Sequence, residues 1–180
     1  MRKWLIAVLF WACAIPAAAT PRSAEQIEKE IKDYLHQHAP KSQLSAERVT
    51  YYAIKHDIDP ILILAQGHIE SHFGTKGSAK RTYSVWNVGA YESRSTTQIR
   101  RSVGYKNVNE SIEPYCLLLK KNYLKGKTVK QLMNNFVNKS GKRYASSPNY
   151  EKQLQAKYAY IKKKTKLYNL WYQIGRASCR

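Results

Sequence analysis

One carboxylate in this chain has the surroundings that acid catalysis requires. Glu70 ends a mostly apolar run that begins at Ile61. If this run is a buried helix, desolvation and the negative end of the helix dipole both raise the pKa of a carboxylate in its last turn. A carboxyl group of that kind keeps its proton near neutral pH and can protonate a leaving oxygen, as the acids of glycosidases do. The alternative interpretation is a capped or ion-paired glutamate at a helix end.

Glycoside hydrolysis commonly needs a second group beside the acid. Glu92 follows Glu70 by 22 residues and could face it across a cleft, although an exposed loop glutamate would look the same. Tyr83, Trp86 and Tyr91 offer ring faces on which sugars can stack, and Trp86 equally suits a core position.

His68 and His72 lie on either side of Glu70 without forming a known metal motif. The zinc-protease pattern H-E-x-x-H places the glutamate directly after the first histidine. Here Glu70 lies about 200° around a helix from each histidine. No other His or Cys cluster completes a site, and no phosphate-binding loop or nucleophile motif is present. We therefore expect neither a metal nor a cofactor.

The helix that carries Glu70 is predicted over residues 60–72. Asp59 is its expected N-cap, Pro60 its first residue and Gly74 its closing residue. Apolar periodicity and capping residues predict further helices over 23–38, 46–56, 108–123, 129–138 and 148–168. Residues 75–106 are rich in Gly, Ser and Thr and indicate loops with a short hairpin. The expected fold class is α+β, predominantly α-helical, with a small loop and β-hairpin lobe beside the catalytic helix.

Both ends of the chain differ from its middle. Residues 1–19 resemble a secretory signal peptide, with Arg2 and Lys3 before a short apolar core and small residues at the cleavage site. We expect export to the periplasm or the extracellular side of the cell envelope, with no transmembrane segment in the mature chain. Residues 173–180 resemble a translated sequencing adapter, so we expect the natural chain to differ there. A single domain over 20–172 remains.

The domain is strongly basic. The formal net charge of the whole chain is +19, and +15 remains without the four arginine and lysine residues of its two ends. Such a charge favours polyanions. For an exported protein these are anionic wall polymers, anionic lipid and the acidic stems of peptidoglycan, and we expect no nucleic-acid partner. A non-catalytic basic wall-binding module is therefore an alternative function. Cys116 is the domain's lone cysteine, so no intrachain disulfide is expected.

Three blocks, spread over roughly residues 45–165, resemble the motifs of one enzyme family in the right order. Residues 65–74, AQGHIESHFG, resemble the AQxxxESxxG signature of bacterial glucosaminidases, the FlgJ/LytG-like enzymes of glycoside hydrolase family 73. Residues 84–90, SVWNVGA, resemble the family's NLFGIKA block, and residues 143–150, RYASSPNY, resemble its YATDPNYA block. The first block is shared with lytic transglycosylases and other lysozyme-like proteins, whereas the third favours the glucosaminidases.

The resemblance implies a lysozyme-like fold and cleavage of the β-1,4 bond after N-acetylglucosamine in the glycan strands of peptidoglycan. It implies Glu70 as the general acid and places Tyr144 beside the reacting sugar. A phenol there can bond an acetamido group or the attacking water without adding charge, and the alternative is a buried tyrosine that caps a helix. The family's second carboxylate usually lies farther along the chain than Glu92, so assistance by the substrate's 2-acetamido group is also open.

The same glutamate would serve a lytic transglycosylase or a muramidase, which stay as alternatives. The candidate catalytic residues are Glu70, Tyr144 and Glu92. The candidate substrate-binding residues are Gln66, Tyr83, Trp86, Asn87, Tyr91 and Tyr150.

Overall fold

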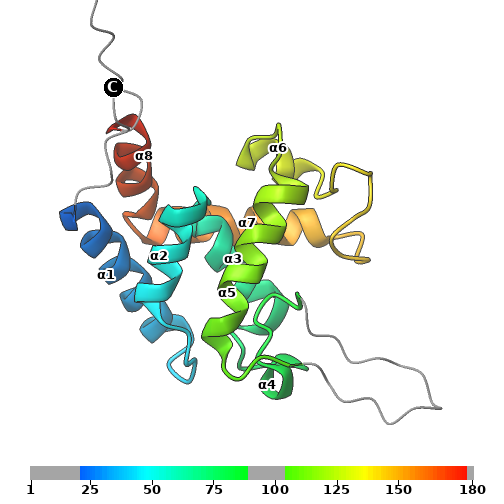
Figure 1. Ribbon diagram of the computed structural model, residues 1–180, viewed down its shortest axis with the longest axis horizontal. Coiled ribbons are helices and arrows are strands. Elements are labelled where there is room, and N and C mark those ends of the chain that lie inside the picture. The colour runs from blue at the N-terminus through cyan, green and yellow to red at the C-terminus, as the bar shows by residue number, and fades with distance from the viewer. Residues whose placement is uncertain (1–20, 89–103, 178–180) are drawn as a thin grey trace, which may run out of the picture.

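The computed structural model of this protein describes residues 21–88 and 104–177 (Figure 1). Its α-helices are α1 (Pro21–His38), α2 (Ala46–His56), α3 (Pro60–Ser71), α4 (Ala79–Thr82), α5 (Ile112–Leu118), α6 (Val129–Asn134), α7 (Tyr150–Lys164) and α8 (Leu167–Ala177). A 3-10 turn, η1 (Val108–Ser111), precedes α5, and a π-helical turn, η2 (Leu119–Tyr123), follows it. Within the described ranges, no helix is long and apolar enough to cross a membrane.

The predicted helical character is confirmed, whereas the β-hairpin lobe is not seen in the described residues. The only extended pairing there is an isolated bridge between Val137 and Arg143. The described part of the expected lobe forms α4 and turns, because Tyr83 and Asn87 have φ of 55° and 54° and interrupt any extended run. Residues 89–103 lie outside the described residues.

The start of α3 follows its local sequence. The Asp59 side chain accepts a hydrogen bond from the Ile61 backbone N–H at 2.8 Å, and Pro60 is the first helical residue. The end differs from the prediction, because the helix stops at Ser71 and three left-handed residues follow. His72, Phe73 and Gly74 have φ of 51°, 57° and 83°. Such a run is costly for residues with a Cβ, and the complete burial of Phe73 helps to hold it.

Three other helices differ from their predicted bounds by more than two residues. The run 108–123 is divided among η1, α5 and η2, and α6 ends at Asn134 instead of residue 138. The run 148–168 breaks at Thr165, which is extended, and its hydroxyl accepts a bond from the Leu167 N–H at 3.4 Å. Helix α8 then continues to Ala177, across the start of the segment that resembles an adapter. That the natural chain differs there stays a prediction.

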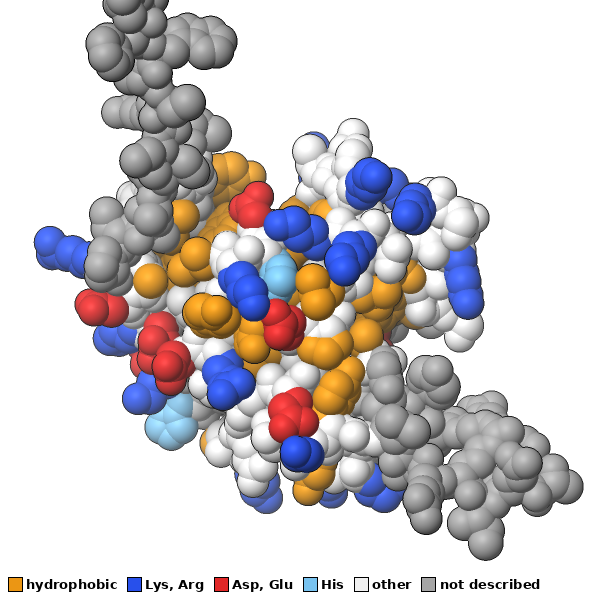
Figure 2. Space-filling model, in the orientation of Figure 1, with side chains coloured by type: hydrophobic (Ala, Val, Ile, Leu, Met, Phe, Trp, Pro, Cys, Tyr) orange, Lys and Arg blue, Asp and Glu red, His pale blue; other side chains and the backbone are white. Residues whose placement is uncertain are grey.

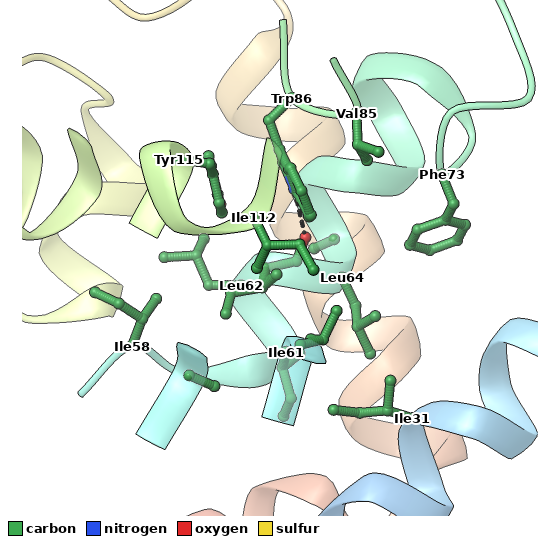
Figure 3. Close-up of a cluster of buried hydrophobic side chains, with 14 of the residues drawn as sticks. Ile31, Ile58, Ile61, Leu62, Leu64, Phe73, Val85, Trp86, Ile112 and Tyr115 are labelled. Atoms are coloured by element: carbon green, nitrogen blue, oxygen red, sulfur yellow. Dashed lines mark hydrogen bonds between the residues drawn. The ribbon is translucent and has the colours of Figure 1, made fainter. Parts of the chain in front are cut away.

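Helix α3 lies at the centre of the fold and packs against α7, α2 and α8. Its residues from Ile61 to Ala65 are fully buried. A helix that is apolar on all sides needs neighbours on all sides. Figure 3 shows how these neighbours meet, with Ile31, Ile58, Val85, Trp86, Ile112 and Tyr115 around the α3 side chains. The last turn of α3 is thereby held in place from several directions.

Candidate active site

The side chain of Glu70 reaches a cleft of about 690 Å³ at the end of α3. The walls of the cleft come from four parts of the chain: the last turn of α3, the turn at 86–88, η2 with the end of α5, and the loop 142–147 with the start of α7. Its polar lining includes Glu70, Asn87, Tyr123, Lys142, Arg143, Tyr144, Ser146, Ser147, Tyr150 and Gln153. The three blocks identified in the sequence therefore meet at one cleft.

Two hydrogen bonds hold the Glu70 carboxylate. The Tyr150 hydroxyl donates to Oε1 at 2.8 Å, and the Asn87 side-chain amide donates to Oε2 at 2.8 Å. Both donors come from distant positions, 80 and 17 residues away in the sequence. Each carboxylate oxygen thus has a fixed neighbour, and the plane of the carboxyl group is defined.

The pKa of Glu70 is raised above its ordinary value. Burial is the largest cause, and the hydrogen bonds from Asn87 and Tyr150 oppose it without overcoming it. Among the described residues, no lysine or arginine forms an ion pair with this carboxylate to stabilise its charge. The environment therefore favours the protonated acid, as the residue pattern predicted.

A buried chain of hydrogen bonds sets the direction of the Tyr150 bond. The Tyr115 hydroxyl donates to Oε1 of Gln66, and Nε2 of Gln66 donates to the Tyr150 oxygen at 2.7 Å. The only proton of Tyr150 is then directed at Glu70. Gln66 was predicted to bind substrate, but its side chain is fully buried and both ends of its amide are used within the protein. That prediction is wrong, and Gln66 instead orients Tyr150.

Asn87 reaches Glu70 because its turn is anchored on both sides. The residue is left-handed, with φ of 54°, which Asn tolerates better than most residues. The Ser71 hydroxyl donates to the Val85 carbonyl at 2.7 Å and accepts from the Gly74 N–H at 2.8 Å. The serine after the acid thus ties the end of α3 to the turn that carries Asn87.

Trp86 is a core residue, and the prediction that its ring stacks on sugars is wrong. Its side chain is fully buried, lies 4.6 Å from the Tyr115 ring between centroids, and donates from Nε1 to the Ile63 carbonyl at 3.0 Å. Gly67 permits this close approach, because a Cβ there would lie 3.1 Å from the indole nitrogen. Figure 3 shows the indole directed at α3. Trp86 therefore anchors the turn that carries Asn87 to the core of the protein.

Tyr144 lines the cleft, and its hydroxyl already donates a hydrogen bond within the protein. Its hydroxyl donates to the Trp86 carbonyl at 2.6 Å, and its ring stacks on Tyr150 with 5.8 Å between centroids. Burial and the nearby Glu70 raise the pKa of the phenol well above its ordinary value, so it stays neutral. The free lone pairs of this oxygen can accept a hydrogen bond from a ligand N–H or from water.

Three predicted site residues remain to be placed: Tyr83, Tyr91 and Glu92. Tyr83 is exposed over a different hollow, which His72 and Lys76 also line, and it is absent from the lining of the Glu70 cleft, so its role in binding substrate stays a prediction. Tyr91 and Glu92 lie outside the described residues, and their roles stay predictions. Within the described ranges, no group of three or more His, Cys, Asp or Glu residues could hold a metal ion.

Two residues that support the site were missed in the sequence. Ser71 had a signal, because it directly follows the acid in the first block. Tyr115 had none, since it lies 49 residues from its partner Gln66 in a helix predicted only from apolar periodicity. Such a contact becomes visible only when α5 is placed against α3.

Comparisons with known proteins give one result. A protein-family model named Glucosaminidase and described as mannosyl-glycoprotein endo-beta-N-acetylglucosaminidase matches residues 46–163, more than half of the chain. Comparison with curated proteins and with solved structures gives no match. The matched range contains all of α2, the whole Glu70 cleft and almost all of α7.

Proposed function

This chain belongs to the glucosaminidase family of glycoside hydrolases, and we propose that it is an exported endo-β-N-acetylglucosaminidase of peptidoglycan. In this proposal Glu70 is the general acid that cleaves the glycan β-1,4 bond. The observation that carries the assignment is the position of Glu70, a carboxyl group with a raised pKa at the floor of the cleft where the three sequence blocks meet.

The hydrogen bonds of Glu70 indicate which oxygen carries the transferable proton. Both oxygens accept a hydrogen bond, but the bond from Gln66 keeps Tyr150 a donor to Oε1, whereas the Asn87 amide can turn and accept from Glu70, so the acid proton is best placed on Oε2. As the C1–O bond breaks, its electron pair passes to the leaving oxygen, which takes the proton from Oε2. Charge then develops on Glu70, and the bonds from Tyr150 and Asn87 become charge-assisted and stronger. Interactions that strengthen in the transition state are the ones that increase the rate.

Tyr144 is proposed to assist on the sugar side of the reaction. Its oxygen can accept from the N–H of a 2-acetamido group or from the attacking water, since its own proton is bound to the Trp86 carbonyl. Glu92 remains the proposed second carboxylate, with participation of the 2-acetamido group as the alternative. In both routes a water oxygen finally bonds to C1, and the product has a reducing N-acetylglucosamine end.

Export is proposed from the composition of residues 1–19, and it agrees with the substrate. A positively charged start, a short apolar core and small residues before position 20 are typical of a signal peptide. The high positive charge suits a protein that works on an anionic cell wall.

The products of digestion test the proposed activity. Purified peptidoglycan is incubated with the protein, reduced with borohydride and analysed by mass spectrometry, and we expect reduced N-acetylglucosamine ends. Reduced muramic ends would identify a muramidase, and 1,6-anhydromuramic ends would identify a lytic transglycosylase. If no fragments were released, the glucosaminidase proposal would fail and the non-catalytic binding module would be favoured.

The pH dependence tests the role of Tyr150. Tyr150→Phe removes a donor that stabilises the Glu70 carboxylate, so the pKa of Glu70 should rise further. The acid then stays protonated to higher pH, and the alkaline limb of the rate profile should move up by about one pH unit, as expected for one hydrogen bond to a charged group. The measurement is kcat/KM against pH on a soluble glycan fragment.

Tyr144→Phe is the matched control for this experiment. It also removes one phenol from the cleft, but this phenol bonds to the Trp86 carbonyl and not to Glu70. The alkaline limb of its kcat/KM profile should lie at the same pH as in the wild type, even if the rate falls. A limb that is unchanged or lowered in Tyr150→Phe would contradict the assignment of Glu70 as the titrating acid.

A further inference from the structure

A second large hollow lies away from the Glu70 cleft. Its volume is about 870 Å³, and it is bounded by η2 and the loop that follows it, α6, the middle of α7, α8 and the turn between α2 and α3. Figure 2 shows blue side chains over and beside α6, across this hollow from orange side chains beside α8. The catalytic proposal uses none of these residues.

The hollow is lined by a group of lysines: Lys120, Lys125, Lys127, Lys130 and Lys162. Two of them have partners that carry no charge. Lys127 donates to the Val137 carbonyl at 2.9 Å, and Nζ of Lys162 lies 3.4 Å from the centroid of the Tyr168 ring. Lys120, Lys125 and Lys130 are exposed, and the hydrogen bonds and ion pairs found among the described residues leave their ammonium groups free.

The acidic residues of the hollow neutralise these lysines only in part, and the charge of Asp59 acts on Lys162. Asp59 is buried, and its carboxylate is occupied by the Tyr158 hydroxyl and the Ile61 N–H. Asp57 is exposed at the rim and is the one other acid in the lining. The hollow therefore has an excess of positive charge, which its own side chains leave uncompensated.

Aromatic side chains form the opposite wall. Tyr168 and Tyr172 lie one turn apart on α8 with 4.5 Å between ring centroids, and Trp171 of α8 and Tyr158 of α7 also line the hollow. Tyr172 is 48% exposed, so part of its ring is open to a ligand. Aromatic faces are suited to the apolar faces of sugars and to aliphatic chain segments.

We infer that this hollow is a second binding site for the substrate polymer, which holds the acidic peptide stems of peptidoglycan at a distance from the cut. The inference rests on the proposed function. Lysines act as hydrated point charges on flexible stems, whereas arginines hold planar anions in a fixed bidentate geometry. A lining with lysines and no arginine suits many carboxylates presented in variable positions along a polymer.

Helix α7 connects the two sites. Tyr150 at its start bonds to Glu70, and Tyr158 and Lys162 farther along line the hollow. Eight residues of helix, from Tyr150 to Tyr158, span about 12 Å. This separation is similar to a few sugar units, so one strand or two adjacent strands of the wall can contact both sites together.

Binding to intact peptidoglycan tests the inference. The Glu70→Gln background prevents digestion, and Lys120, Lys125 and Lys130 are all changed to Gln. Co-sedimentation uses purified peptidoglycan stripped of phosphate polymers and lipid, at low and high salt. We expect the apparent Kd at low salt to rise about tenfold, as three weak surface charge contacts would give together, and the salt dependence of binding to become smaller.

The matched control changes Lys152, Lys163 and Lys164 to Gln, which removes the same charge from exposed positions of α7 that line neither site. Its Kd should change less than twofold. An equal loss of affinity in both triple variants would overturn the inference, because total charge alone would then explain binding. Binding that weakens only when phosphate polymers are left in the preparation would also overturn it.

The inference and the proposed function fail in different ways. In the active background, the Lys120, Lys125 and Lys130 variant should cleave short uncharged N-acetylglucosamine oligomers at the wild-type rate and intact peptidoglycan more slowly. Equal rates on both substrates, together with unchanged binding, would reject the second site and leave the glucosaminidase proposal standing. Wild-type protein that binds peptidoglycan but releases no reducing ends would instead reject the proposed function.

Discussion

Glu70→Gln is expected to lower the rate of glycan cleavage by about 10²–10⁴-fold, the contribution that general acid catalysis typically makes. An amide has no proton to give to the leaving oxygen. The new side chain has the same shape, so its oxygen can accept from Tyr150, while its NH₂ group meets the Asn87 amide, which can turn to present its own oxygen. The site should therefore keep its geometry and lose its chemistry.

The free energy of unfolding should not fall in this variant at neutral pH. Because the folded state raises the pKa of Glu70, ionising this group costs folding free energy as the pH rises through the folded pKa. The uncharged amide removes that cost, so the stability should be equal to or slightly above that of the wild type. Urea unfolding at pH 7 measures this, and the release of reducing ends from peptidoglycan measures the rate.

Glu113→Gln is the control, since Glu113 is paired with Lys55 on the surface at 2.7 Å and lies outside the cleft. It should leave the cleavage rate unchanged. If Glu70→Gln kept more than about one tenth of the wild-type rate, a contribution of the size expected for a general acid would be absent, and another residue would have to supply the proton.

Trp86→Ala is expected to lower the free energy of unfolding by about 3–5 kcal/mol, the usual cost of deleting a large buried aromatic side chain. The ring is fully buried between Tyr115 and α3, and it makes one hydrogen bond to the α3 backbone. Its removal would leave a cavity beside Gly67. It would also release the turn that holds Asn87 against Glu70, so the cleavage rate of the folded fraction should fall as well.

Urea unfolding of Trp86→Ala, followed by circular dichroism, checks the stability, and activity is assayed well below the unfolding midpoint. Tyr51→Ala is a suitable control because Tyr51 is 57% exposed, and exposed substitutions of this kind usually change stability by less than about 0.5 kcal/mol. A loss below about 1 kcal/mol in Trp86→Ala would show that the ring does not carry the packing described above.

Local sequence was sufficient to predict the element that carries the acid. Asp59 and Pro60 define the start of α3 by hydrogen bonding and by a fixed φ, both of which depend on immediate neighbours. The apolar residues on all sides of α3 require burial, and burial in the last turn raises the pKa of Glu70. The predominantly helical character and the position of Glu70 near the end of a central helix were therefore predicted from the residues, whereas the expected β-hairpin lobe is not seen in the described residues.

The direction of each side chain at the site was decided by the tertiary structure. Gln66, Trp86 and Tyr83 all lie within or near the blocks, yet one orients Tyr150, one fills the core and one lies over another hollow. Their partners are 84 and 23 residues away for Gln66 and Trp86, on α7 and α3.

Spacing along a chain specifies which face of a helix a residue occupies, but not which distant element covers that face. In this protein, the packing of α5, α7 and the 84–88 turn around α3 determines which element covers each face of α3. The sequence alone determined that a partly buried glutamate would lie in the last turn of a central helix. Only the packing determined that Tyr150 and Asn87 would hold its carboxyl group and that Tyr144 would share its cleft.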